Sequence, residues 1–151
     1  MIEVGERAPE FSLPDQHGQR VQLSSFAGQR DVVLVFYPYS FTGVCGGELL
    51  ALNEQLPQLQ NDRVQLLAVS VDSMFSQRVF AEQQGLGFPL LADYWPHGEV
   101  ARAYGVFDEK VGAALRGTFV IDKDGVVRWS VLNTIPDGRD ITAYHRALAA
   151  L

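Results

Sequence analysis

The sequence predicts an α/β fold in which a mixed sheet carries helices on both sides. Two apolar runs, at 31–37 and 64–71, are too continuous for half-exposed strands and are typical of strands that are covered on both faces. Each run is followed by a segment with helical spacing or helix-start residues, which gives a β–α–β–α order. Late in the chain, 117–121 and 126–132 flank the turn-forming residues 122–125, a strong signal for an antiparallel hairpin.

Shorter signals place the remaining elements. Alternating segments at 11–13 and 21–23 flank the turn-forming stretch 15–19, which predicts an N-terminal β-hairpin. Leucines recur at helical spacing within 44–60, and Pro57 is expected to kink that helix or end it early. The other predicted elements are a helix from 72 to 84 that stops at Gly85, a short strand at 89–92, a short helix at 99–104 and a closing helix at 141–151.

Length and composition are typical of one compact domain. The chain has 151 residues, of which 47% are hydrophobic and 20% are charged, and this balance excludes a disordered or collagen-like protein. No internal repeat is visible, and no stretch of low complexity is long enough to be a linker. We therefore expect a single domain over residues 1–151.

Charge and hydropathy exclude two classes of partner. Twelve Lys and Arg residues against 18 Asp and Glu residues give a net charge of −6 and a pI near 4.9, which argues against binding nucleic acid. The longest apolar runs are far shorter than the roughly 20 residues that cross a bilayer, so no membrane span is expected. Met1–Arg7 has an early acid and a glycine where a signal peptide needs a basic start and an apolar core. We expect a cytoplasmic protein.

Cys45 is the one cysteine of the chain. It cannot form an intramolecular disulfide, so a redox cycle on it must take the second sulfur from another molecule. It lies where a predicted strand ends and a helix begins, a place where sites collect in open α/β sheets. If Thr42 is the N-cap, Cys45 is the third helical residue, where unpaired N–H groups and the helix dipole favour a thiolate. The alternative is that Cys45 is a small buried hydrophobic side chain.

The residues around Cys45 resemble the active-site pattern of the peroxiredoxins. That pattern is Pro, three residues, Thr or Ser, two residues and Cys, and Pro38, Thr42 and Cys45 match it in register. Peroxiredoxins also carry an arginine just ahead of a late strand, and Arg116 looks like that element. Residues 93–98 look like the matching loop of the AhpE-type one-cysteine peroxiredoxins of actinobacteria. The resemblance implies a thioredoxin-like (peroxiredoxin) fold, with the N-terminal β-hairpin, and the reduction of hydroperoxides.

Each residue of the motif has a physical role in such a reaction. A thiolate at Cys45 attacks one peroxide oxygen while the other leaves as hydroxide or alkoxide, so the site must stabilise moving negative charge. Arg116 can hold the thiolate and the peroxide oxygens, and the Thr42 hydroxyl can accept the peroxide proton. Pro38 has no N–H and limits competing hydrogen bonds near the sulfur. Glu48, three residues after Cys45 on the same helix face, is close enough to orient an arginine.

Plainer roles stay open for the same residues. Thr42 could be an N-cap alone, and Pro38 could serve only to end the strand. Glu48 could be a first-turn acid that complements the helix dipole, and Arg116 could be a surface charge.

One feature departs from the family pattern. Many peroxiredoxins have Thr or Pro directly after the cysteine, whereas here Gly46 and Gly47 follow Cys45. Each glycine costs roughly 1 kcal/mol relative to alanine inside a helix. The two glycines therefore put the rigidity of the first helical turn in doubt, and they would ease local unwinding around an oxidised sulfur.

No cofactor or metal is expected. His17, His97 and His145 fall in a turn, a loop and the last helix, without the spacing of metal ligands. Residues 85–87 (Gly-Leu-Gly) lack the strand-to-helix context of a dinucleotide-binding loop and are interpreted as a turn.

Two other classes of function compete with a thiol-dependent peroxidase. A cysteine-dependent acyl hydrolase would need a histidine base near Cys45, and no histidine is placed there by the motif. A thioredoxin-like binding or chaperone module would leave Cys45 incidental. The peroxidase hypothesis implies a hydroperoxide substrate and an external thiol or a glutaredoxin- or mycoredoxin-like reductant. Aromatic residues in the loops 37–41 and 94–96 further suggest a homodimer.

Overall fold

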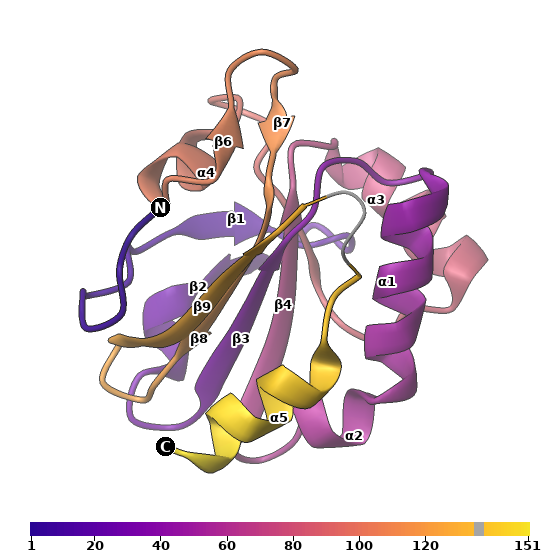
Figure 1. Cartoon of the computed structure of the whole chain (residues 1–151). Helices are drawn as coiled ribbons and strands as arrows, with labels where there is room; N and C mark the ends of the chain where they lie inside the picture. The colour runs from indigo at the N-terminus through magenta and orange to yellow at the C-terminus, as the bar shows by residue number, and fades with distance from the viewer. Residues whose placement is uncertain (135–137) are drawn as a thin grey trace.

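The computed structural model describes residues 1–134 and 138–151, and at Val44 and Cys45 it describes the backbone alone. Within this part of the chain, a five-stranded mixed sheet has the order β5-β4-β3-β8-β9 (Figure 1). The central strand β3 (Asp31–Phe36) pairs in parallel with β4 (Val64–Ser70) and antiparallel with β8 (Arg116–Ile121). The mixed sheet and the two fully covered central strands were predicted correctly, because β-branched residues covered on both faces leave no alternation in the sequence.

The outer strands complete the sheet. Strand β5 (Leu90–Ala92) pairs in parallel with β4, and β9 (Val127–Asn133) pairs antiparallel with β8. The β8–β9 pair is the predicted late hairpin.

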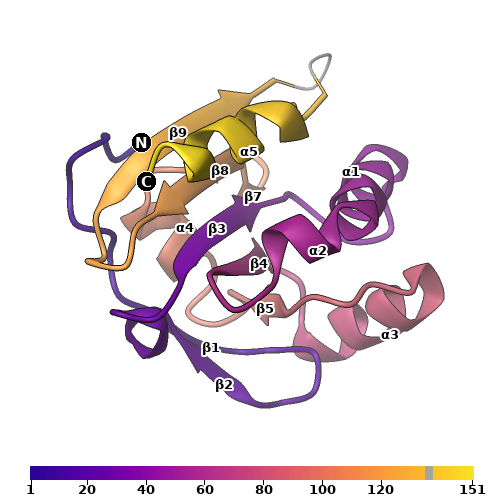
Figure 2. The ribbon, with the colours of Figure 1, turned by 90° about the horizontal axis from the view of Figure 1, so that it is seen from below.

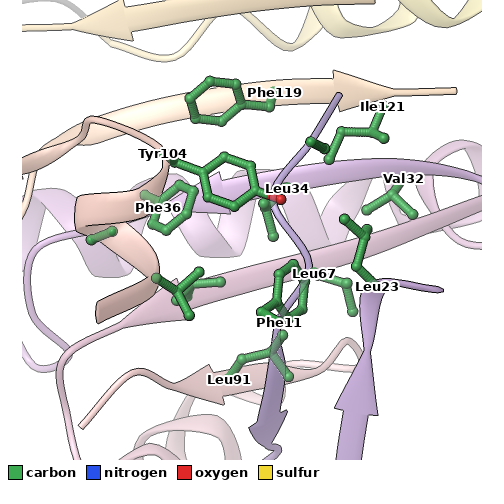
Figure 3. Close-up of a cluster of buried hydrophobic side chains, with 14 of the residues drawn as sticks. Phe11, Leu23, Val32, Leu34, Phe36, Leu67, Leu91, Tyr104, Phe119 and Ile121 are labelled. Carbon is green, nitrogen blue, oxygen red and sulfur yellow. The ribbon is translucent and has the colours of Figure 1, made fainter. Parts of the chain in front are cut away.

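A hairpin, a short helical turn and one helix cover the first face of the sheet. The hairpin consists of β1 (Ser12–Pro14) and β2 (Arg20–Gln22), and it confirms the predicted N-terminal β-hairpin. The 3-10 helix η1 (Leu23–Phe26) and the short helix α4 (Glu99–Ala103) lie beside it. Just after α4, the Tyr104 ring packs between Phe36 of β3 and Phe119 of β8, with ring centroids 5.4 and 5.2 Å away (Figure 3).

Among the described residues, four helices cover the opposite face (Figure 2). They are α1 (Gly43–Glu54), α2 (Leu56–Leu59), α3 (Met74–Gln84) and α5 (Ile141–Ala149). Leu49 and Leu52 of α1, Phe80 of α3 and Tyr144 of α5 are all buried there. Helices therefore lie on both sides of the sheet as predicted, with most of the helical surface on one side.

The helix predicted at 44–60 is two helices. Helix α1 ends at Glu54, and Pro57 stands in the first turn of α2, where its missing N–H removes no helical hydrogen bond. Helix α3 has the expected ends, since the Ser73 side chain accepts from Ser76 N (3.1 Å) and Gly85 caps the other end in the left-handed conformation. No helix of the described residues is long and apolar enough to cross a membrane.

Candidate active site

Three chain segments meet at one end of the sheet. Strand β3 ends at Phe36, and a short loop leads to α1 (Figure 1). Strand β8 runs antiparallel to β3 with Val35 opposite Thr118, so Arg116, two residues earlier in β8, lies beside the end of β3. The topology thus brings Pro38, Thr42, Arg116 and the start of α1 to the same end of the sheet. Arg116 contacts Glu48 of α1, although 68 residues of sequence separate them.

Thr42 is the N-cap of α1. Its backbone is extended (φ −98°, ψ 146°), and its carbonyl accepts from Gly46 N at 2.9 Å, which closes the first helical turn. Cys45 is therefore the third helical residue, as predicted. The backbone N–H groups of this first turn have no carbonyl partner within the helix, and the helix dipole is positive at this end. The side chain of Cys45 lies outside the described residues. Gly46 and Gly47 both lie within α1, so the first turn is helical despite them.

The Thr42 hydroxyl points back along the loop. It donates to the carbonyl of Tyr39 at 3.1 Å. A hydroxyl has one hydrogen and two lone pairs, so a hydroxyl whose hydrogen is already used can meet a ligand only as an acceptor. The threonine side chain is exposed and can be reached by a small molecule.

Glu48 joins two buried arginines. One carboxylate oxygen contacts Nη2 of Arg116, and the other accepts from Nε of Arg139 at 2.5 Å. The side chains of Arg116 and Arg139 are 4% and 2% exposed, and that of Glu48 is 11% exposed. Glu48 is thus in direct contact with Arg116, as expected from its position three residues after Cys45. It is the sixth residue of α1, so it is not an acid of the first turn.

The two guanidinium groups are also fixed by neutral acceptors. Arg116 Nη1 donates to the carbonyl of Thr134. Arg139 donates to Thr118 Oγ1 at 2.9 Å and to the carbonyl of Phe36, the last residue of β3, at 2.5 Å. Since hydrogen bonds on several sides leave a guanidinium little freedom, both charges are preorganised near the start of α1.

Arg139 was missed at the sequence level. It stands in a short polar segment before α5, where an isolated arginine carries no periodic or motif signal. Its contact with Glu48 spans 91 residues of sequence, and local sequence patterns do not show such a contact.

Pro38 is half-buried and lies at this same end of the sheet. Just before it, the backbone N–H of Tyr37 makes one more sheet-like hydrogen bond, to the carbonyl of Val69 at 3.0 Å. Pro38 therefore marks where the chain leaves the sheet.

Known proteins resemble this chain over its whole length. Residues 4–130 match the AhpC/TSA family, and Alkyl hydroperoxide reductase E of Mycobacterium tuberculosis is 46% identical over 151 residues, covering 100% of this chain and 99% of the relative. The chain belongs to the AhpC/TSA family of peroxiredoxins. A second relative of this peroxiredoxin, the chloroplastic 2-Cys peroxiredoxin BAS1 of Hordeum vulgare, is 36% identical over 158 residues, 98% of this chain and 74% of that protein.

Solved structures agree with the family assignment. Peroxidoxin BcpB from Mycobacterium tuberculosis superposes with a TM-score of 0.88 at 30% identity, over 100% of this chain and 99% of the other. AhpC from Enterococcus faecalis gives a TM-score of 0.89 at 29% identity, over 99% and 92% of the two chains. This peroxiredoxin therefore has the thioredoxin-like fold that the resemblance implied.

Proposed function

We propose that this peroxiredoxin is a thiol-dependent peroxidase that reduces hydrogen peroxide, alkyl hydroperoxides and peroxynitrite through Cys45. One observation carries the proposal: the single cysteine is the third residue of α1, at the end of the sheet where Glu48 holds two buried arginines. Family membership supports it, as does the name of the mycobacterial relative, an alkyl hydroperoxide reductase.

The first step would transfer one oxygen to sulfur. The Cys45 thiolate attacks the terminal oxygen of the peroxide and the O–O bond breaks. The other oxygen leaves as hydroxide or alkoxide that takes a proton from water, or as nitrite when the substrate is peroxynitrite. Arg116 would donate to the thiolate and to the peroxide oxygens, where its two-pronged guanidinium stabilises the charge that moves between them. Thr42 would accept the hydrogen bond of the peroxide O–H, since its own hydrogen is used on Tyr39 O.

The other two site residues would act on these groups. Glu48 would set the direction of Arg116, because the two are in direct contact. Pro38 would keep a backbone N–H and water away from the sulfur.

The second step would need a sulfur from outside the chain. The first step leaves a sulfenic acid at Cys45, and a thiol displaces water from it to give a mixed disulfide. A second thiolate, from a glutaredoxin- or mycoredoxin-like protein or another thiol, then attacks that disulfide and releases the Cys45 thiolate. We propose that this cycle runs in the cytoplasm, where thiols are kept reduced. All residues assigned to it belong to one domain, residues 1–151.

Intact mass after peroxide treatment tests the one-cysteine cycle. One equivalent of peroxide in the presence of a small thiol should give a mixed disulfide, and a reductase should then restore turnover. Without any thiol, excess peroxide should stop turnover after about one cycle and add two oxygens in total at Cys45, because the sulfenate is oxidised to the sulfinate. Sustained turnover with no thiol or protein reductant present would contradict the cycle.

We also propose that the protein is a homodimer. Large aromatic side chains are exposed in the loop before α1 (Tyr39 and Phe41), in the first turn of α3 (Phe75) and in the loop after β5 (Tyr94 and Trp95, the latter 82% exposed). Aromatic residues are enriched at the centres of interfaces. Light scattering at micromolar concentration should give twice the 16.7 kDa of one chain. Trp95→Glu should lower this mass while Val4→Glu, which alters another exposed apolar residue, should not; a monomeric wild-type protein would rule the dimer out.

A further inference from the structure

The loop that precedes α1 is anchored to the neighbouring strand by a carboxylate that the proposed mechanism does not use. Asp72 follows the end of β4 by two residues, and its Oδ2 atom accepts from the backbone N–H of Ser40 at 2.8 Å. The Ser70 hydroxyl donates to the same oxygen at 2.6 Å. Ser40 is buried, so the donor end of this bond is shielded from water.

A buried network fixes the inner side of this anchor. Gln77 of α3 is fully buried, and its Nε2 atom donates to Ser70 Oγ at 3.0 Å and to the carbonyl of Leu91 at 2.8 Å. The Tyr37 hydroxyl lies 3.1 Å from Ser40 Oγ. Burial raises the pKa of Tyr37 to about 12, so this hydroxyl is neutral at physiological pH. Ser70, which donates to Asp72, is thus tied through Gln77 to α3 and to β5.

The anchored segment contains a backbone conformation that needs support. Phe41 has φ +66°, in the left-handed region that residues with side chains rarely adopt. Its ring packs edge-on against Phe80, with centroids 5.3 Å apart. Such conformations persist only where the surrounding structure holds them, and they cluster at functional sites.

The same turn sets the direction of the Thr42 hydroxyl. Thr42 follows Phe41, and its hydroxyl donates to the carbonyl of Tyr39, so donor and acceptor flank the segment Ser40–Phe41. On the outside, the Tyr39 hydroxyl donates to the carbonyl of Val111 at 2.9 Å. If the Ser40 anchor were lost, Phe41 would be free to relax toward negative φ, and the Tyr39 carbonyl and Thr42 would turn relative to each other.

We propose that Asp72 is a positioning residue for the peroxide step: by holding Ser40 N it keeps the Ser40–Phe41–Thr42 turn in the form that presents Thr42 Oγ1 to the substrate. Asp72 acts through the loop and does not touch the reacting atoms. The inference rests on the proposed function, because it assigns Asp72 to the reaction proposed for Cys45.

The positioning role of Asp72 can be tested by comparing the rates of two reactions of Cys45. Peroxide reduction uses the Thr42 hydroxyl as acceptor, whereas alkylation of Cys45 by iodoacetamide needs the thiolate alone. Asp72→Ala should therefore lower the ratio of the peroxide rate constant to the alkylation rate constant at least about tenfold. Asp72→Asn, whose Oδ1 can still accept from Ser40 N and from Ser70, should restore this ratio to within about threefold. Asp62→Ala, which removes an exposed acid elsewhere, should leave it unchanged.

A merely structural role would predict different results. It would lower the melting temperature without changing the ratio of the two rates, because both are measured on folded protein. If Asp72→Ala does not fold, Asp72→Ser, which is too short to reach Ser40 N, takes its place. In a Thr42→Val background, Asp72→Ala should have no further effect on the peroxide rate.

The outcomes separate this inference from the proposed function. A wild-type protein that does not consume peroxide would overturn both. A wild-type protein that does, combined with an unchanged rate ratio in Asp72→Ala or an additive effect in the Thr42→Val background, would overturn the role of Asp72 alone.

Discussion

Replacing Cys45 by serine is expected to abolish peroxide reduction and to lower the rate to that of buffer. The sulfur of a thiolate is polarisable and can accept an oxygen atom, whereas a serine hydroxyl is not ionised at neutral pH and forms no stable oxygenated product. No second cysteine exists in the chain to take over the reaction. The measurement is peroxide consumption with a thiol reductant in excess, for wild type and variant side by side.

The serine variant also separates the competing functions. Serine and cysteine have nearly the same shape, so the melting temperature should change little, and loss of activity cannot be assigned to unfolding. A binding or chaperone module would keep its full activity in Cys45→Ser, and a cysteine-dependent acyl hydrolase would lose ester hydrolysis instead. Peroxide consumption that persists in the variant at the wild-type rate would sink the assignment of Cys45 as the nucleophile.

The parts of the fold that the sequence predicts are those with a long local signal. The strands β3 and β4 appear as apolar runs, and the ends of α3 are marked by Ser73 and Gly85. The strands β6 (Phe107–Asp108) and β7 (Ala113–Ala114) were missed, because two residues are too few to show an alternation. The break between α1 and α2 was indicated only by Pro57.

In the candidate site, too, only the residues with a local sequence signal could be predicted. Cys45 and Thr42 could be predicted because a strand end, an N-cap and a motif of fixed spacing all lie within a few residues. Arg139 and Asp72 could not, because each acts through a contact between segments that are far apart in sequence. The direction of the Thr42 hydroxyl is also absent from the sequence, since it depends on the unusual backbone at Phe41.

Removing the Glu48 carboxylate is expected to have the largest effect on stability of any single charge. Glu48 contacts both Arg116 and Arg139, and all three side chains are nearly buried. Without the carboxylate, two positive charges face each other in a region of low dielectric, and breaking a buried ion pair in this way costs about 3–5 kcal/mol. For a chain of this size we expect Glu48→Ala to lower Tm by roughly 10 °C.

The same substitution should slow the peroxide step at least about tenfold, or ~1.4 kcal/mol, because Arg116 would lose the partner that directs it. The matched control is Glu54→Ala, which removes an exposed acid of the same helix and should change neither Tm nor rate. Equal effects of the two substitutions would contradict the role of Glu48.

Should Glu48→Ala fail to fold, Glu48→Gln keeps the shape of the side chain and removes only its charge. Adding Arg139→Met to Glu48→Gln should then recover part of the stability but not the full rate, because one of the repelling charges is gone while Arg116 still lacks its carboxylate.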